Sequence, residues 1–282
     1  MRGTHEPPKR KDPMNHARII DAHCHVFPAK IAEKATRSIG DFYDIPMDEV
    51  GSAERLLQEM DLAGIDLALI CSTATKPEQV ASINAFIRDT AEASGGRFYG
   101  FGTLHQDMTD EEIGDELDKI VSFGLHGIKL HSDFQRFYID DERMIPVYRE
   151  IARRGLPVLF HMGDARMDYS APERLKKVAR EVPELLSIAA HLGGYSVWDR
   201  AEILAGEENV VFDCSSSLPM LTRERALWQI GLFGVDRIFF GSDFPMWKPG
   251  EEIERVRALC LGKEQEEMIF HKNFERWIMK KV

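Results

Sequence analysis

The sequence predicts an α/β protein folded as a single (β/α)8 barrel. Two observations lead to this prediction. Short, nearly continuous apolar runs alternate with amphipathic helical patterns, and the alternation repeats eight times without a break in composition. Runs of this kind are typical of parallel strands covered on both faces, and eight strand–helix units fit one barrel. A doubly wound sheet is the alternative architecture for the same pattern.

Eight apolar runs are the expected strands. They lie at 18–23, 66–73, 97–104, 126–131, 156–161, 186–191, 209–215 and 236–243. The connection 28–65 is the longest between neighbouring strands, and it has room for an additional helix or a lid. We expect the barrel to occupy residues 18–282 and residues 1–17 to form a disordered tail, since they carry no apolar pattern.

The stretches between the strands carry the period of amphipathic helices. In 52–64 the apolar residues fall on one face, and Gly64 follows as a C-terminal cap. The stretch 110–124 opens with Asp110, which is its expected N-cap. The other helices are expected over 77–96, 145–155, 171–183 and 222–234.

Composition narrows the partners and the compartment. The 282-residue chain has a formal net charge of −11, which disfavours electrostatic binding of nucleic acid. No apolar run approaches the roughly 20 residues that cross a bilayer. The four cysteines form no CxxC pair, which indicates reduced thiols in a cytoplasmic protein. We therefore expect a small-molecule substrate, no nucleic acid or membrane partner, and, as a reasonable expectation, a homodimer.

Histidines gather at the ends of the expected strands. The polar residues at these ends are His23 with His25, His131, His161, His191 and Asp243. The C-terminal ends of the strands in a parallel barrel share one rim, and that rim carries the active site. A random distribution of ten histidines would not favour this rim so strongly.

Strand geometry sharpens this expectation. Side chains alternate between the two faces of a strand, so His23 and His25 point the same way while Cys24 points toward the helices. If His23 faces the barrel axis, both imidazoles converge on the barrel mouth. By the same alternation Gly241 shares a face with Asp243, and a glycine there leaves room at the centre.

Imidazole and carboxylate groups are suitable ligands for a divalent ion such as Zn²⁺. Three or four ligands drawn from His23, His25, His161 and Asp243 leave a position open for water, whose pKa a bound zinc ion lowers to about 7. His191 would act beside it as an acid or base. Each histidine alone is more often structural, so the joint pattern at one rim carries the prediction. Mn²⁺ and Fe²⁺ are alternative ions.

At this point several motifs carry a resemblance to a known family. The motifs are DAHCHVFP, GIKLHSDFQ, GLPVLFHMGDAR, HLGG and GSDFPMW. With them the chain resembles the amidohydrolase superfamily, and more closely its amidohydrolase 2 branch, over almost everything after the tail. The resemblance implies a metal held by His23, His25, His161 and Asp243, with His191 and Asp243 in proton transfer. The branch contains hydrolases, including lactonases, and also decarboxylases.

Four further residues are candidates for substrate binding. They are Lys129, His131, Arg166 and Trp247. In binuclear members of the superfamily a lysine near the position of Lys129 is carboxylated and bridges two metals; we expect one metal and an unmodified lysine. Arg166 could hold a substrate carboxylate, or it could form a loop ion pair with Asp164 or Asp168. Trp247 could wall the pocket or pack under the final helices.

Three functions fit these residues. The leading hypothesis is hydrolysis, in which a metal-activated water attacks an amide, ester or lactone carbonyl of a small substrate. The alternative is decarboxylation of an aromatic or unsaturated carboxylic acid, which needs a cation such as Arg166 or Lys129 to hold the anion. The third function is that of a barrel that binds a metal ion without catalysing a reaction. It is disfavoured because the sequence retains both the presumed base, His191, and an open coordination position on the metal.

Overall fold

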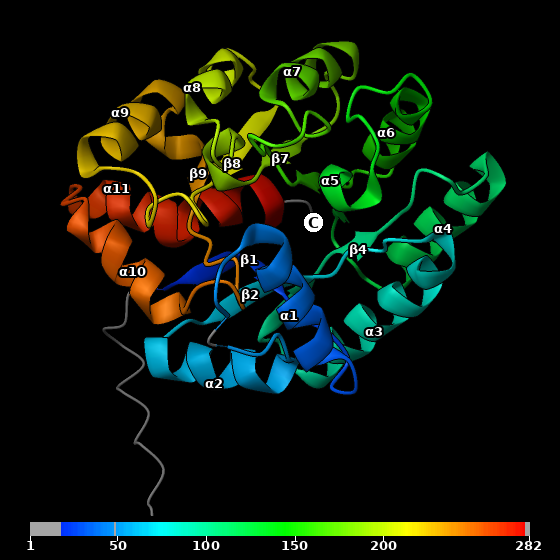
Figure 1. Ribbon diagram of the computed structural model, residues 1–282, viewed down its shortest axis with the longest axis horizontal. Coiled ribbons are helices and arrows are strands. Elements are labelled where there is room, and N and C mark those ends of the chain that lie inside the picture. Colours follow the sequence, from blue (N-terminus) through cyan, green and yellow to red (C-terminus); the bar gives the residue numbers. More distant parts are fainter. Residues whose placement is uncertain (1–17, 48, 280–282) are drawn as a thin grey trace, which may run out of the picture.

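Parallel strands lie at the centre of the molecule, and helices surround them (Figure 1). The computed structural model describes residues 18–47 and 49–279. The predicted tail, residues 1–17, lies outside the described residues. In the described part no helix combines the length and the apolar character that crossing a bilayer requires.

Each expected apolar run contains a strand. The strands are β1 (Ile20–His25), β2 (Leu67–Cys71), β3 (Phe98–Gly100), β4 (Gly102–Thr103), β5 (Ile128–Leu130), β6 (Val158–Phe160), β7 (Ser187–Ala189), β8 (Val210–Asp213) and β9 (Ile238–Phe239). They pair in parallel in two groups, β1 to β3 and β4 to β9. The third predicted run holds both β3 and β4, which are separated by a single residue.

Backbone hydrogen bonds join the two groups. Phe101, between β3 and β4, donates its N–H to Ile70 O on β2 at 3.0 Å, which extends the β2–β3 ladder toward β4. On the other side His25 N donates to Phe244 O at 2.7 Å, just after β9. The strands therefore form the predicted (β/α)8 barrel, and the fold is not a doubly wound sheet.

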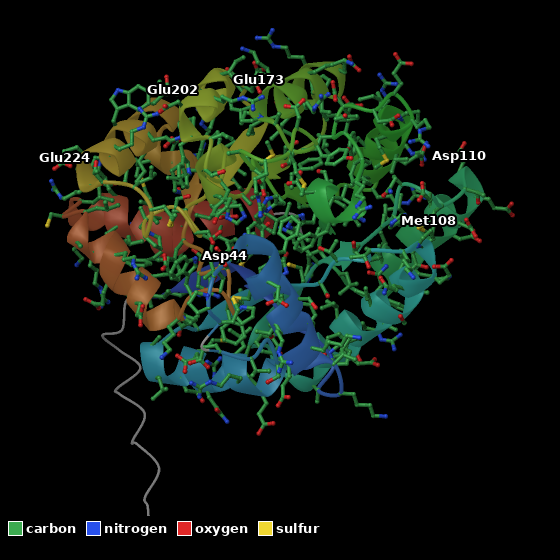
Figure 2. The ribbon with its side chains drawn as sticks, viewed as in Figure 1. Asp44, Met108, Asp110, Glu173, Glu202 and Glu224 are labelled. Carbon is green, nitrogen blue, oxygen red and sulfur yellow. The ribbon has the colours of Figure 1, made fainter. Side chains whose placement is uncertain are left out.

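Helices follow the strands as the sequence pattern predicts. They are α1 (Ala32–Tyr43), α2 (Ala53–Ala63), α3 (Val80–Ala93), α4 (Asp110–Ser122), α5 (Ser132–Gln135), α6 (Met144–Arg153), α7 (Pro172–Glu181), α8 (Trp198–Ala201), α9 (Arg223–Phe233), α10 (Pro249–Ala258) and α11 (Lys263–Glu267). The acidic residues Glu173, Glu202 and Glu224 lie on the outer ring (Figure 2).

The predicted N-cap of α4 is wrong by one residue. Thr109 caps the helix, since its hydroxyl accepts a hydrogen bond from Glu112 N at 3.2 Å. The Glu112 carboxylate accepts in return from Thr109 N at 2.8 Å. This reciprocal pair satisfies two backbone N–H groups, which Asp110 as the cap would not achieve.

Helix α1 occupies the long connection between β1 and β2, where the sequence left room for a helix or lid. It crosses in front of the strands (Figure 1), and Asp44, which ends it, lies near the centre of the same view (Figure 2). One side of α1 packs through the buried Ala32, Thr36 and Gly40. A Cβ at Gly40 would lie 2.7 Å from Met47 Cγ, so only glycine permits this close packing.

The apolar core has an outer part, between the strands and the helices, and an inner part inside the barrel. The side chains of β1 are divided between the two. Cys24 packs in the outer part, between strands and helices, on the side that was predicted. Ile20 and Ala22 pack in the inner part, inside the barrel. The pairing register shifts between Asp21 and Cys24, and this irregularity lets His23 also face the axis. His23 and His25 thus leave β1 on the side of the barrel mouth.

Candidate metal centre at the barrel mouth

Three donor atoms from the first and last strands converge at the mouth. His23 Nε2 lies 3.2 Å from His25 Nε2, and Asp243 Oδ1 lies 3.6 Å and 3.4 Å from these two nitrogens. Ligands about 2.1 Å from a tetrahedral or octahedral ion are separated by about 3.0–3.5 Å. The three donors therefore have the chemistry and the spacing to hold one divalent ion.

A buried carboxylate orients the first of these histidines. His23 Nδ1 lies 3.0 Å from Asp213 Oδ2, and both side chains are buried. A partner of this kind fixes the tautomer, so that Nε2 keeps its lone pair for a ligand. Burial lowers the pKa of His23 well below its ordinary value, which also favours the neutral ring. Sequence reasoning missed Asp213, which lies within the expected strand 209–215 and is the last residue of β8.

Asp243 is held in an uncommon backbone conformation. Its φ of 59° is left-handed, a region that residues other than glycine seldom occupy. Ser216 Oγ donates to Asp243 Oδ2 at 2.6 Å, which leaves Oδ1 toward the histidines. Burial acts to raise the pKa of this carboxyl, but the neighbouring imidazoles hold it well below its usual range.

Trp247 supports this arrangement from behind. Its indole Nε1 donates to Ser216 Oγ at 3.0 Å, and Ser216 in turn holds Asp243. Trp247 lines a smaller cavity beside the mouth, together with Tyr195 and Met220. Trp247, a predicted substrate-binding residue, therefore lies next to Ser216, which holds the carboxylate of Asp243.

Lys129 lies inside the donor group. Its Nζ is 3.1 Å from His23 Nε2, and the side chain is completely buried. Burial lowers the pKa of its ammonium group. The lysine therefore contacts the same nitrogen that faces the other donors, and it is not an ion-pairing residue of the outer rim.

A cysteine that the sequence pattern assigned to the core contacts the second histidine. Cys71 Sγ lies 3.7 Å from His25 Nδ1. Burial acts to lower the pKa of His25, but Cys71 and Asp243 outweigh this effect and raise it to about 9. These contacts favour the protonated ring, and metal binding at this nitrogen requires the neutral one.

His191 lies between two of the predicted ligands. Its ring stacks on His23, with centroids 5.2 Å apart, and its Nε2 faces His161 Nδ1 at 3.1 Å. Its Nδ1 lies 3.0 Å from Ser215 Oγ. Burial lowers the pKa of both His191 and His161, so neutral rings are favoured. His191 has a left-handed φ of 60°, and its backbone is thus strained like that of Asp243.

His161 and His131 form a second group around a tyrosine that the sequence did not single out. Tyr43 OH, from the end of α1, lies 3.0 Å from His131 Nε2 and 3.4 Å from His161 Nε2. His131 stacks on His161 with centroids 3.9 Å apart. His161 also contacts Gly163 and His191, and its Nε2 lies 3.4 Å from Asp133 Oδ2. His191 thus stands between His161 and the three-donor group. The sequence around Tyr43 gives no signal for this position. Only the placement of α1 over the barrel mouth brings Tyr43 to the two histidines.

Arg166 is engaged in an ion pair. Its Nε and Nη2 bond to Asp164 Oδ1 and Oδ2 at 2.9 Å and 2.6 Å. Its Nη1 donates to Phe42 O on α1 at 2.6 Å, and the guanidinium lies 4.7 Å from the centre of the Phe42 ring. Of the two interpretations left open by the sequence, the structure has the ion pair with Asp164.

Some of these groups line one cavity of about 1000 Å³. Its floor includes His25, His131, His161, His191 and Asp243. Its walls are mainly apolar and aromatic side chains from α1, α3 and α5, with Arg166 at the edge. A large apolar cavity with convergent polar groups is the usual form of an enzyme active site.

The sequence and the structure were compared with known proteins. The family model described as Amidohydrolase matches residues 20–278. The 2-amino-3-carboxymuconate-6-semialdehyde decarboxylase of Dictyostelium discoideum is 22% identical over 250 residues, covering 71% of this chain and 70% of that protein.

Two solved structures have a similar fold. An uncharacterized TIM-barrel protein of Bordetella bronchiseptica has a TM-score of 0.75 at 22% identity, covering 92% of this chain and 98% of that one. The 5-carboxyvanillate decarboxylase of Sphingomonas paucimobilis has a TM-score of 0.72 at 17% identity, covering 94% and 99%. With a family model matched from β1 to the end of the described helices, this chain belongs to the amidohydrolase family.

Proposed function

We propose that this protein is a metal-dependent decarboxylase of an aromatic or unsaturated carboxylic acid. The observation that carries the proposal is the sequence similarity over 250 residues to 2-amino-3-carboxymuconate-6-semialdehyde decarboxylase. The sequence motifs alone favoured hydrolysis, and this relative favours the alternative. The donor group, the buried cation and the cavity walls each support it.

His23, His25 and Asp243 would hold the ion, with His161 close by. We expect Zn²⁺, with Mn²⁺ or Fe²⁺ as alternatives, because imidazole and carboxylate ligands accept all three. When bound, the ion supplies positive charge that holds the substrate carboxylate and polarises it. Asp213 would keep the His23 ring oriented for this role.

The charges of the site favour an anionic substrate. Lys129 brings a buried ammonium group to within 3.1 Å of His23 Nε2. A buried charge is stable only beside a partner of opposite charge, and Asp243 and Asp213 supply two negative charges against the divalent ion and Lys129. A substrate carboxylate would supply the negative charge that is still needed.

The walls of the cavity suit an unsaturated body. Phe27, Phe42 and Phe134 line the cavity, and Tyr43 lies in the same wall. Aromatic side chains pack favourably against planar π systems in offset or edge-to-face geometry. An aromatic or dienoic acid would therefore place its carboxylate at the donor group and its carbon skeleton against these rings.

Decarboxylation requires a proton at carbon. The bond between the carboxyl carbon and the skeleton breaks, CO₂ leaves, and the electron pair of that bond takes up a proton. We assign this proton transfer to His191, which would take up a proton from water and pass it to carbon, while the carboxylate of Asp243 stabilises the protonated ring. Ser215 fixes Nδ1 of His191, and its Nε2 is directed into the mouth toward His161.

The proposal is tested by measuring CO₂ release. The purified protein is loaded with Zn²⁺, Mn²⁺ or Fe²⁺ and offered hydroxybenzoic and dienoic acids, alongside amides, esters and lactones. We expect CO₂ release from at least one acid, loss of activity on chelation and its return with the ion. Hydrolysis of a lactone, ester or amide without any CO₂ release would contradict the proposal and restore hydrolysis as the function.

A further inference from the structure

Two helices beside the candidate metal centre, α1 and α3, each bring apolar residues to the cavity from a side other than their fully buried one. Helix α1 packs through Ala32, Thr36 and Gly40, which are buried. Its residues Ala35 and Ile39 lie on a different side and line the cavity. The spacing of four residues within each set places them on two separate stripes of the same helix.

Helix α3 repeats this arrangement. Its buried residues Val80, Asn84 and Ile87 face the barrel. Ile83 and Phe86 are only half-buried, and they line the same cavity as the second stripe of α1. The two sets therefore line one cavity, together with residues that follow β1 and β2, and Ile83 and Phe86 also pack against the core.

This part of the cavity is lined by uncharged side chains. Apolar residues predominate in size, and the polar residues among them are Ser38, Ser72, Thr73, Thr75, Gln79 and Ser82. We call this part the side chamber and define it by Phe27, Ile31, Ile39, Ile83 and Phe86. The lining that α1 and residues 72–86 contribute contains no charged side chain. The charged lining residues outside the donor group come from the opposite side, on α5 and the loop after β6. They are Asp133, Arg136, Arg166 and Asp168.

The side chamber is continuous with the metal centre. The same cavity reaches His25 and Asp243, and Phe27 follows His25 by two residues. Its volume of about 1000 Å³ is at the upper end of the range of about 300–1,000 Å³ that is typical of small-molecule sites. A monocyclic acid bound at the donor group would leave much of this volume unfilled.

Building on the proposed function, we infer that the side chamber binds an apolar extension of the substrate, such as an aryl or alkyl group, while the carboxylate lies at the donor group. Apolar side chains left in water forfeit about 25 cal/mol for each Å² that they could bury. Ile31 is 49% exposed, and Ile83 and Phe86 are half-buried, so a substrate extension has apolar surface to cover. The preferred substrates are thus larger than monocyclic acids.

The experiment compares two probes on the metal-loaded protein by titration calorimetry. The short probe is benzohydroxamate, which binds metal ions through its hydroxamate group, and the extended probe is biphenyl-4-carbohydroxamate. We expect the extended probe to bind about tenfold more tightly, because its second ring buries additional apolar surface.

Ile83→Trp fills the side chamber and should abolish this tenfold gain while leaving the affinity for benzohydroxamate unchanged. Leu62→Trp is the matched control, because Leu62 lies on α2 and is 78% exposed; it should retain the gain. Both substitutions lie on helix surfaces, and circular dichroism verifies that both variants are folded.

Two results would overturn the inference. One is equal affinity of the two probes in the unsubstituted protein, and the other is a tenfold gain that survives Ile83→Trp. In both cases benzohydroxamate still binds, so the proposed metal function stands. Failure of benzohydroxamate to bind would instead contradict the proposed function, and with it the inference.

Discussion

His23 Nδ1 and Asp213 Oδ2 lie 3.0 Å apart, and neither side chain is exposed to solvent. This contact sets the tautomer of His23 and directs Nε2 toward the other donors. We expect Asp213→Asn to weaken metal binding by about 10- to 100-fold, because the amide can donate to Nδ1 and favour the wrong tautomer. A competition assay with a fluorescent chelator measures the affinity.

Asp110→Asn is the control for this prediction, since Asp110 is exposed on α4. Unchanged metal affinity in Asp213→Asn would show that Asp213 has only a structural role.

Adding the ion should stabilise the folded chain. A ligand at 100 times its dissociation constant adds about 2.7 kcal/mol to the free energy of unfolding. We therefore expect Zn²⁺ or Mn²⁺ to raise the melting temperature by several degrees, and a chelator to reverse the shift. His23→Gln removes one of the three donors and should abolish most of the shift. A full shift in that variant would place the ion elsewhere.

Tyr43 should contribute to turnover through the two histidines that it contacts. Tyr43→Phe removes a hydroxyl that lies 3.0 Å from His131 Nε2 and 3.4 Å from His161 Nε2. One lost hydrogen bond corresponds to about 1 kcal/mol, so we expect kcat/KM to fall about five- to tenfold. Tyr99→Phe on β3 is the matched control. A fall of equal size in both variants would contradict a specific role of Tyr43.

Substitution of Arg166 distinguishes an ion pair with Asp164 from a role in holding the substrate carboxylate. Its side chain is half-exposed and paired with Asp164. An exposed ion pair is worth about 0–1 kcal/mol, so we expect Arg166→Gln to change the melting temperature by only a few degrees and KM by less than about tenfold. Steady-state kinetics on an acid substrate measures KM. A rise of a hundredfold or more would show that Arg166 releases Asp164 to hold the substrate.

Glu252 should make stability fall as the pH rises. Burial raises its pKa from the ordinary value of 4.5 to about 8, although Arg255 opposes this shift. The folded chain therefore holds a proton that the unfolded chain releases, so stability declines between about pH 4.5 and 8. We expect Glu252→Gln to raise the melting temperature at pH 8.5 and to have little effect at pH 5. An equal effect at both pH values would exclude titration of Glu252 as the cause.

Much of the fold follows from patterns that are local in the chain. Every predicted apolar run contains a strand, because a strand buried on both faces needs a continuous apolar sequence. The placement of His23, His25 and Asp243 at one rim follows from parallel topology, but the inward direction of His23 depends on the register shift between Asp21 and Cys24, which alternation did not predict. Asp110 was a wrong cap because two neighbouring residues can both cap, and only the reciprocal bond with Glu112 selects Thr109.

The rest depends on contacts between distant segments. Tyr43 reaches the mouth only because α1 crosses it, and no local pattern fixes that direction. The sequence allowed Arg166 to pair either with a substrate carboxylate or with a nearby aspartate, and these two partners are chemically equivalent. The conformation of the loop after β6 decides between them, because it brings Asp164 to the guanidinium. The metal identity, the homodimer and the cytoplasmic location stay predictions.

The barrel closes where its first and last strands meet, and two donors come from one of these strands while the third follows the other. Asp243 N donates to His23 O at 2.8 Å, so the backbone itself joins the two donor segments. The three donors come together only when the first and last strands pair. An ion at the proposed site would therefore stabilise the closed barrel at the contact between these two strands.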